Sequence, residues 1–414
     1  MNKKKLVVFL MWAFLPMIIV GLVMSSIADA ASGNPMTAII RPLMSAGAMF
    51  IPLLSVIITQ LIFKEPVLKD VGISFKLNKW WWIGWLLMPL VAILTLGATL
   101  LMPGAKWTPD SELMQQALQS MPEGIGVWGL IGITLLSGLF AGLTINAVFA
   151  LGEEVAWRGF LMREFKGKSF WSSAIWIGVI WGLWHAPLIL NGHNYPQHPL
   201  AGVFMMVVFC ILLSVMLMYF REKSGSVIVA AIMHGTINAV AGITMLVVTP
   251  ANDLLNGATG LAGMIVLLIV DAGLYLYDKS VGMNKRSWFI PILIVAVNVL
   301  AVIVKWRSLP DPLPAHFDLQ GNASGTMPRN MLILYVLIGA AICLISYLIG
   351  RKKRGLQTGL VVLTSGICLV LLLSTMVTLT SGAMPVFMLA EPVVLLAAVV
   401  GFVVAVVKSY KKRA

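Results

Sequence analysis

The chain has 414 residues, of which 59% are hydrophobic and only 11% charged, and its formal net charge is +13. Soluble domains average about half apolar and about a quarter charged residues, so this composition excludes an ordinary soluble protein and predicts a polytopic membrane protein. The three cysteines stand singly in apolar runs without metal or redox spacing, and we expect them to fill space.

Twelve apolar segments reach the length of about 20 residues that a transmembrane helix needs. We therefore predict an all-α bundle of about twelve spans, at 6–24, 37–62, 81–102, 126–165 (one span), 170–190, 200–220, 226–249, 260–277, 288–304, 331–350, 357–379 and 386–407.

The basic residues predict the orientation of these spans. With a cytoplasmic N-terminus, 24 of the 29 Lys and Arg fall in cytoplasmic segments, and the exceptions are Arg41, Lys106, Lys305, Arg307 and Arg329. The positive-inside rule then places both termini in the cytoplasm of a bacterial-type cell membrane. The basic excess is explained by topology, so we expect no nucleic-acid partner.

The first span begins after a Lys-rich start and ends near Ala28-Asp29-Ala30, which resembles a signal-peptide cleavage site. Its apolar run of 18 residues, 6–23, exceeds the usual length of about 7–15. We expect a retained helix; the alternative, cleavage, would leave the later topology unchanged.

The linker 277–286 divides the chain into two predicted domains. Residues 1–283 hold eight spans with a motif core at about 125–245. Residues 284–414 form a four-helix membrane domain with an extracytoplasmic Pro-rich loop at 305–330.

The stretch 126–165 is too long for one simple span, whereas two spans would reverse every later loop. We expect a break near Gly138 to Gly142 and a helix that continues to about Phe165.

This helix carries Glu153, Glu154 and Arg158. Glu154 and Arg158 are i and i+4 and can pair on one face, while Glu153 is rotated by about 100° and is predicted to face a cavity. An ionised carboxylate within a bilayer costs at least a few kcal/mol, which favours a functional role. The alternative is an ordinary salt bridge at a cytoplasmic helix end.

Two further polar sites lie on later spans. His185 precedes Pro187, which is expected to kink the helix. His234 and Asn238 are four residues apart and share a helix face, where Gly235 would let a neighbouring helix approach. The alternatives are a packing role for His185 and an interhelical hydrogen-bonding role for the other two.

Counted at about 1.5 Å per residue from the nearest cytoplasmic charge, Glu153, His185 and His234 lie roughly 20, 26 and 17 Å deep. Because the hydrocarbon is about 30 Å thick, all three can meet near its middle.

A carboxylate, two imidazoles and an amide suit hydrolysis by an activated water. Glu153, His185 and His234 could instead hold a zinc ion and its water, which stays an open alternative because no His-Glu-x-x-His motif is present. No Gly-rich phosphate loop and no persuasive Ser or Cys nucleophile is found.

Together the motifs resemble the CAAX-protease and bacteriocin-processing (Abi) family of intramembrane proteases, whose pattern is Glu-Glu-x-x-x-Arg, Phe-x-x-x-His and His-x-x-x-Asn or Asp. The likeness covers about residues 125–245, with Trp181 at the family's Phe position. It implies that the chain cleaves peptide bonds within the membrane. By the same likeness, Glu153 and His185 activate water, and His234 with Asn238 stabilises the oxyanion. Metal dependence stays open.

Two extracytoplasmic loops complete the pattern. The run from Leu309 to Asp318, followed by Gly321, resembles a segment of bacterial immunity-type membrane proteins and is expected to form a rigid, Pro-locked cap. In the loop 191–199 we expect His193 and His198 to be solvated.

The sequence therefore predicts a membrane-embedded endopeptidase that hydrolyses a membrane-delivered peptide or protein tail. One alternative is a non-catalytic immunity or sensor protein that binds a peptide in the same cavity. Another is a transporter, but the chain shows no second set of these motifs, as related halves would require.

Overall fold

The computed structural model describes residues 2–30, 35–280, 288–306, 309–317, 323–352, 356–379, 391 and 394–403. The chain forms two compact units, Met1–Asp271 and Ala272–Ala414, and helix α14 (Leu261–Ser280) runs across the division. The domain boundary predicted at 283 and 284 lies outside the described residues and stays a prediction.

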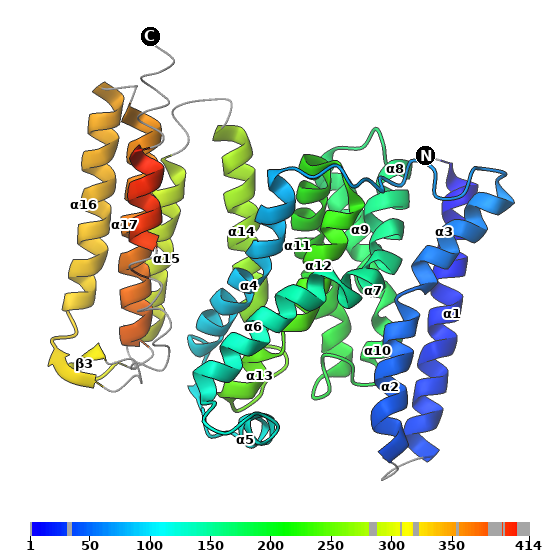
Figure 1. The fold of residues 1–414 in the computed structure, drawn as a ribbon, viewed down its shortest axis with the longest axis horizontal. Helices are drawn as coiled ribbons and strands as arrows, with labels where there is room; N and C mark the ends of the chain where they lie inside the picture. Colours follow the sequence, from blue (N-terminus) through cyan, green and yellow to red (C-terminus); the bar gives the residue numbers. More distant parts are fainter. Residues whose placement is uncertain are drawn as a thin grey trace. The chain divides into compact units, whose positions relative to one another are not determined.

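The first unit is a bundle of helices joined by loops of varied length (Figure 1). In chain order these are α1 (Lys3–Ala30), α2 (Pro35–Ala48), α3 (Ile51–Ile62), α4 (Lys79–Leu100), α5 (Glu112–Gln119), α6 (Val127–Leu143), α7 (Ile145–Glu154), the π-helix η1 (Val155–Leu161), α8 (Met162–Glu164), α9 (Phe170–Trp184), α10 (Ala186–Ile189), α11 (Pro199–Ser224), α12 (Val227–Val240) and α13 (Ile243–Val247).

In the second unit, α15 (Phe289–Lys305), α16 (Met331–Lys352) and α17 (Gln357–Leu379) pack against one another. A further apolar helix covers Val394–Val403. All three cysteines of the chain are free and buried, as predicted.

The predicted helical membrane protein is confirmed, whereas the count of twelve spans is not. Within the described residues, eight helices are long and apolar enough to cross a membrane, and a bent pair makes a ninth. Three shorter apolar helices, Leu261–Leu274, Ile290–Ile303 and Val394–Val403, lie in the remaining predicted segments. The basic segment at 408–413 lies outside the described residues.

The fold is not purely helical. Strands β1 (Lys106–Trp107) and β2 (Val248–Thr249) form an antiparallel pair, and so do β3 (Leu313–Phe317) and β4 (Ala323–Met327) in the Pro-rich loop. The side chains of Leu313 and Ala315 are buried, in the alternation of a strand. The prediction of a Pro-locked cap missed this hairpin because Pro is tolerated in a two-stranded edge pairing.

The predicted break in the stretch 126–165 exists, but it lies at Thr144 rather than between Gly138 and Gly142. Helices α6 and α7 meet there at an angle of 54°. The two glycines remain within helix α6, and Gly142 permits close helix packing instead of a break. A Cβ on Gly142 would lie 2.7 Å from the Cα of Thr236, so the glycine lets α12 approach α6 closely.

Beyond the break, the helix continues through η1 and α8 to Glu164, as predicted. Every residue of η1 is buried. Single π-helical turns within α-helices occur frequently at functional sites, and this turn directly follows Glu153 and Glu154.

Helix α12 is the centre of the first unit and packs against α4, α6, α7 and α11. A Cβ on its Gly235 would lie only 2.7 Å from the backbone carbonyl carbon of Asn146. This confirms the expectation that Gly235 lets a neighbouring helix, here α7, come close. The approach brings the polar residues of both helices together.

The helices of the first unit end on two faces. On one, which we call the N-terminal face, Lys5 bonds to both Glu65 and Glu164, and Arg163 bonds to the same two carboxylates. The other, the loop face, carries the loops at 190–198 and 250–260. Figure 1 shows α8 near the N-terminus of the chain and α5 and α13 at the other end of the bundle.

Candidate active site

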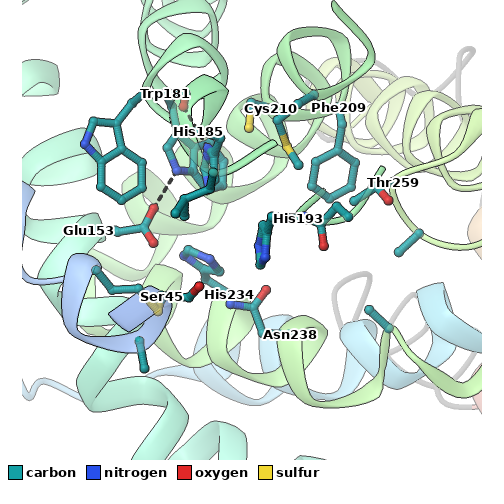
Figure 2. A pocket seen from close by; sticks show the side chains of 18 of the residues that line it. Ser45, Glu153, Trp181, His185, His193, Phe209, Cys210, His234, Asn238 and Thr259 are labelled. Atoms are coloured by element: carbon teal, nitrogen blue, oxygen red, sulfur yellow. Dashed lines mark hydrogen bonds between the residues drawn. The ribbon is translucent and has the colours of Figure 1, made fainter. Parts of the chain in front are cut away.

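A cavity of about 720 Å³ lies inside the first unit. Its wall includes Glu153 from α7, His185 after α9, and His234 and Asn238 from α12. Figure 2 shows these four side chains around one space. The predicted convergence of three distant helices at one cavity is therefore present: α7 packs against α12, and α9 packs against α11, which also contacts α12.

Glu153 lies in the cavity wall with only 2% of its surface exposed. Its Oε2 accepts hydrogen bonds from the indole N–H of Trp181 at 2.6 Å and of Trp157 at 3.3 Å. Both donors stabilise a negative charge on the carboxylate. Because they hold one oxygen, Oε1 is the oxygen that remains for a water or a substrate.

Glu154 and Arg158 lie behind this wall. Both side chains are fully buried and their nearest N···O distance is 2.9 Å, so the predicted i,i+4 pair forms and the alternative of a surface salt bridge is wrong. The guanidinium also lies 4.2 Å from the ring centroid of Trp181. Neither residue lines the cavity, and their contacts are suited to positioning other groups.

His234 is the side chain that Glu154 holds in position. Its Nδ1 lies 2.9 Å from Oε1 of Glu154, and its ring meets Trp181 edge-on at 5.3 Å. Since a carboxylate accepts, Nδ1 is the protonated nitrogen, and Nε2 is left for the cavity. The interhelical hydrogen bond considered as an alternative is thus present for His234.

Asn238 lies one turn further along α12 and is exposed to the cavity. Within the described part of the chain its side-chain amide has no hydrogen-bond partner. The interhelical role considered for it is not seen there, and its N–H groups are available to a bound molecule.

His185 lies between α9 and α10, where the helix breaks two residues before Pro187 as expected. Its Nδ1 is 2.9 Å from the carbonyl oxygen of Trp181. A carbonyl can only accept, so Nδ1 carries the proton and Nε2 of the neutral ring is an acceptor. His185 can therefore orient or deprotonate a water at Nε2.

Trp181 is a residue of the candidate site whose contacts the sequence did not predict. The resemblance to the family pattern treated its place as any aromatic, yet its indole N–H holds Glu153 and its carbonyl holds His185. Phe could supply the ring and the carbonyl but not the N–H. The sequence did give an indication, because the indole N–H of a buried Trp usually donates a hydrogen bond to a partner.

His193 and His198 are exposed, in agreement with their predicted solvation, but the sequence did not predict what they contact. His193 lines the cavity, as Figure 2 shows, and Nδ1 of His198 lies 2.6 Å from Oδ1 of Asp253. Asp253 joins the loop 190–198 to the loop 250–260 at the loop face. The pairing could not be inferred from the sequence because 55 residues separate its partners.

The residues named for zinc, Glu153, His185 and His234, do not form a metal cluster in this geometry. Among the described residues no three His, Cys, Asp or Glu side chains lie close enough to share an ion. Both histidines do have an acceptor on Nδ1, as metal ligands commonly do. These three side chains therefore do not fit a zinc ion in this structure, and the proposed reaction uses the side chains alone.

Comparisons with known proteins agree with the motifs. Residues 134–240 match the family model described as Type II CAAX prenyl endopeptidase Rce1-like, and they include all six predicted site residues. A curated relative, CAAX prenyl protease 2 of Methanococcus maripaludis, is 29% identical over 140 residues, or 32% of this chain. The aligned part covers 48% of that protein, about half its length. The predicted resemblance to CAAX proteases is confirmed over this segment.

In the second unit, residues 293–339 match a domain of unknown function (DUF1648). The match includes the Pro-rich loop and is consistent with the predicted likeness of that segment to other membrane proteins. Asp318 and Gly321, which belong to the segment that resembles immunity-type membrane proteins, lie outside the described residues.

Proposed function

We propose that the chain is an intramembrane endopeptidase of the cell membrane, which hydrolyses a peptide bond of a membrane-delivered peptide or protein tail. The observation that carries the proposal is the buried carboxylate of Glu153 at a cavity that also contains two imidazoles and an amide. The match to the CAAX endopeptidase family supports the same reaction class.

In the proposed first step, a water lies between Glu153 Oε1 and Nε2 of His185. Glu153 takes one proton from the water, and the oxygen attacks the carbonyl carbon of the scissile bond. The indole N–H groups of Trp181 and Trp157 keep the carboxylate in place and oriented.

The carbonyl oxygen then carries the negative charge of a tetrahedral intermediate. We assign its stabilisation to the amide N–H of Asn238 and to Nε2–H of protonated His234. The carboxylate of Glu154, held by Arg158, stabilises that imidazolium through Nδ1. Glu154 and Arg158 thus act as positioning residues.

In the last step the C–N bond breaks, and the leaving amine takes the proton from Glu153. The products are a carboxylic acid and an amine, and Glu153 is again ionised; proton transfer from the acid to the amine then gives a carboxylate and an ammonium group. Every proton moves between water, substrate and this side chain, which makes the proposal glutamate-dependent.

The test is the variant Glu153→Gln, which keeps the shape but cannot accept the proton. We expect peptide cleavage in reconstituted membranes to fall by at least about a hundredfold, the scale of a lost general base. Asn256→Ala, a buried loop amide outside the cavity wall, is the matched control.

Wild-type cleavage by the folded Glu153→Gln protein would refute this assignment. Peptide binding without any cleavage by the wild type would favour the sensor or immunity alternative. A chelator titration on the same assay tests the catalytic type, and we expect activity to be retained.

A further inference from the structure

The cavity of the first unit is asymmetric. Besides the polar groups near Glu153 and apolar side chains of α11, its wall contains residues of α2, the segment Asn191–Asn194 and the loop residues Ala258 and Thr259, the last two groups belonging to the loop face. No residue of the ionic cluster on the N-terminal face contributes to it. The cavity therefore extends from Glu153 toward the loop face.

The wall near that face contains one permanent positive charge, Arg41 on α2. Its Nη2 donates a hydrogen bond to the backbone carbonyl of Asn191 at 2.5 Å, which fixes the guanidinium at the edge of the loop 190–198. No carboxylate among the described residues forms an ion pair with it. One bond uses one of five N–H donors, so a fork remains for an anionic group.

The two faces differ sharply in charge. The N-terminal face carries the lysines at the start of α1, those between α3 and α4, and those after α8. Among the described residues of the first unit, Arg41 and Lys106 are the only Lys and Arg on the loop face. By the positive-inside rule the loop face is extracytoplasmic.

We propose that the cavity takes its substrate from the extracytoplasmic side, and that Arg41 binds a carboxylate of the peptide at the entrance. This inference rests on the proposed peptidase function, because only that function makes the bound peptide a substrate. The direction of access and the charge at the entrance follow from the cavity wall and the charge distribution. A guanidinium binds a carboxylate through two parallel N–H bonds, which would also fix the direction of the peptide.

Direction of access is tested by thiol labelling in intact cells with a membrane-impermeant maleimide, in a Cys210→Ala background. His193→Cys and Glu123→Cys report on the loop face, and Lys76→Cys on the N-terminal face; all three positions are exposed. We expect the first two to react in intact cells and Lys76→Cys only after permeabilisation. The opposite pattern, or equal labelling of both faces, would overturn the inference.

The role of Arg41 is tested with Arg41→Gln and the charge-conserving Arg41→Lys. For a peptide with a carboxylate we expect Arg41→Gln to raise KM about tenfold or more, the scale of a lost charged hydrogen bond, with kcat little changed. Arg41→Lys should recover part of the loss. Two peptide series, one amidated at the C-terminus and one with acidic side chains neutralised, identify which carboxylate is bound.

An equal KM for charged and neutral peptides, in the wild type and in Arg41→Gln, would refute the role of Arg41. These outcomes differ from failure of the peptidase function, in which no peptide is cleaved by any variant. The labelling result does not depend on cleavage.

Discussion

At the scale of single residues, the site depends on hydrogen bonds that a motif cannot express. The spacing of Glu154 and Arg158 predicted their pairing, and it is present with both side chains fully buried. The partner of that pair, His234, lies 80 residues away, and the donor to Glu153, Trp181, lies 28 residues away. Both partners are chosen by helix packing.

Trp181 gives the first prediction at this scale. Trp181→Phe removes the 2.6 Å donor to Glu153 but keeps a ring and the carbonyl that holds His185. A hydrogen bond to a charged group contributes about 1.5–3 kcal/mol, so we expect kcat to fall by roughly tenfold or more with KM little changed.

Trp157→Phe is the matched control, since Trp157 donates to the same oxygen over a longer 3.3 Å. Its effect on kcat should be smaller. An equal loss in both variants, or a loss of thermal stability that accounts for inactivity, would count against a specific positioning role for Trp181.

At the scale of elements, glycines decide how closely helices approach. Gly142→Ala places a methyl group against Thr236, where a Cβ would lie 2.7 Å from both Cα and Cβ. Overpacking of this kind costs typically about 1–3 kcal/mol. We expect a lower Tm in detergent and reduced peptide cleavage, since α12 carries His234.

Gly132→Ala on the same helix is the control, because a Cβ at this position would meet nothing within 4 Å. Because Ala has a higher helix propensity than Gly, the Tm of this variant should stay level or rise. A Gly142→Ala protein with unchanged Tm would show that α6 can shift without disturbing the site.

A second element-scale prediction concerns the N-terminal face, where Glu65 joins α1 to the end of α8 through Lys5 and Arg163. Burial acts to raise the pKa of Glu65, but hydrogen bonds and charges from Lys5 and Arg163 outweigh it and hold the pKa below its ordinary value of 4.5. A group with a lowered folded-state pKa stabilises the fold above its unfolded pKa, and the contribution is lost as pH falls through the folded pKa.

Glu65→Gln should therefore lower the Tm in detergent at neutral pH, and its difference from wild type should vanish as the pH falls below the ordinary value. Glu123→Gln, at an exposed loop position, should leave the Tm unchanged. A difference between Glu65→Gln and wild type that is independent of pH would contradict the assignment to ionisation.

At the scale of the whole molecule, each of the twelve apolar segments contains a described helix, although at most nine of these pass as spans. The twelve-span topology with cytoplasmic termini stays a prediction. Reporter fusions after Lys166, Lys223 and Lys285 should report the cytoplasm, and fusions after Asn194 and Arg329 the outside. If the fusion after Lys285 reported the outside, the number of spans before it would be odd, which would contradict the eight that are predicted there.

The sequence by itself determined the membrane class, the approximate helix positions and the polar residues proposed for the site. These follow from local properties: apolar length, basic flanks and helical spacing. Only the tertiary structure decided that Trp181 holds Glu153, that the break lies at Thr144, and that Arg41 belongs to the cavity wall. Each of these depends on contacts between helices far apart in the chain, whose packing follows from the shapes of both surfaces and cannot be read from either segment alone.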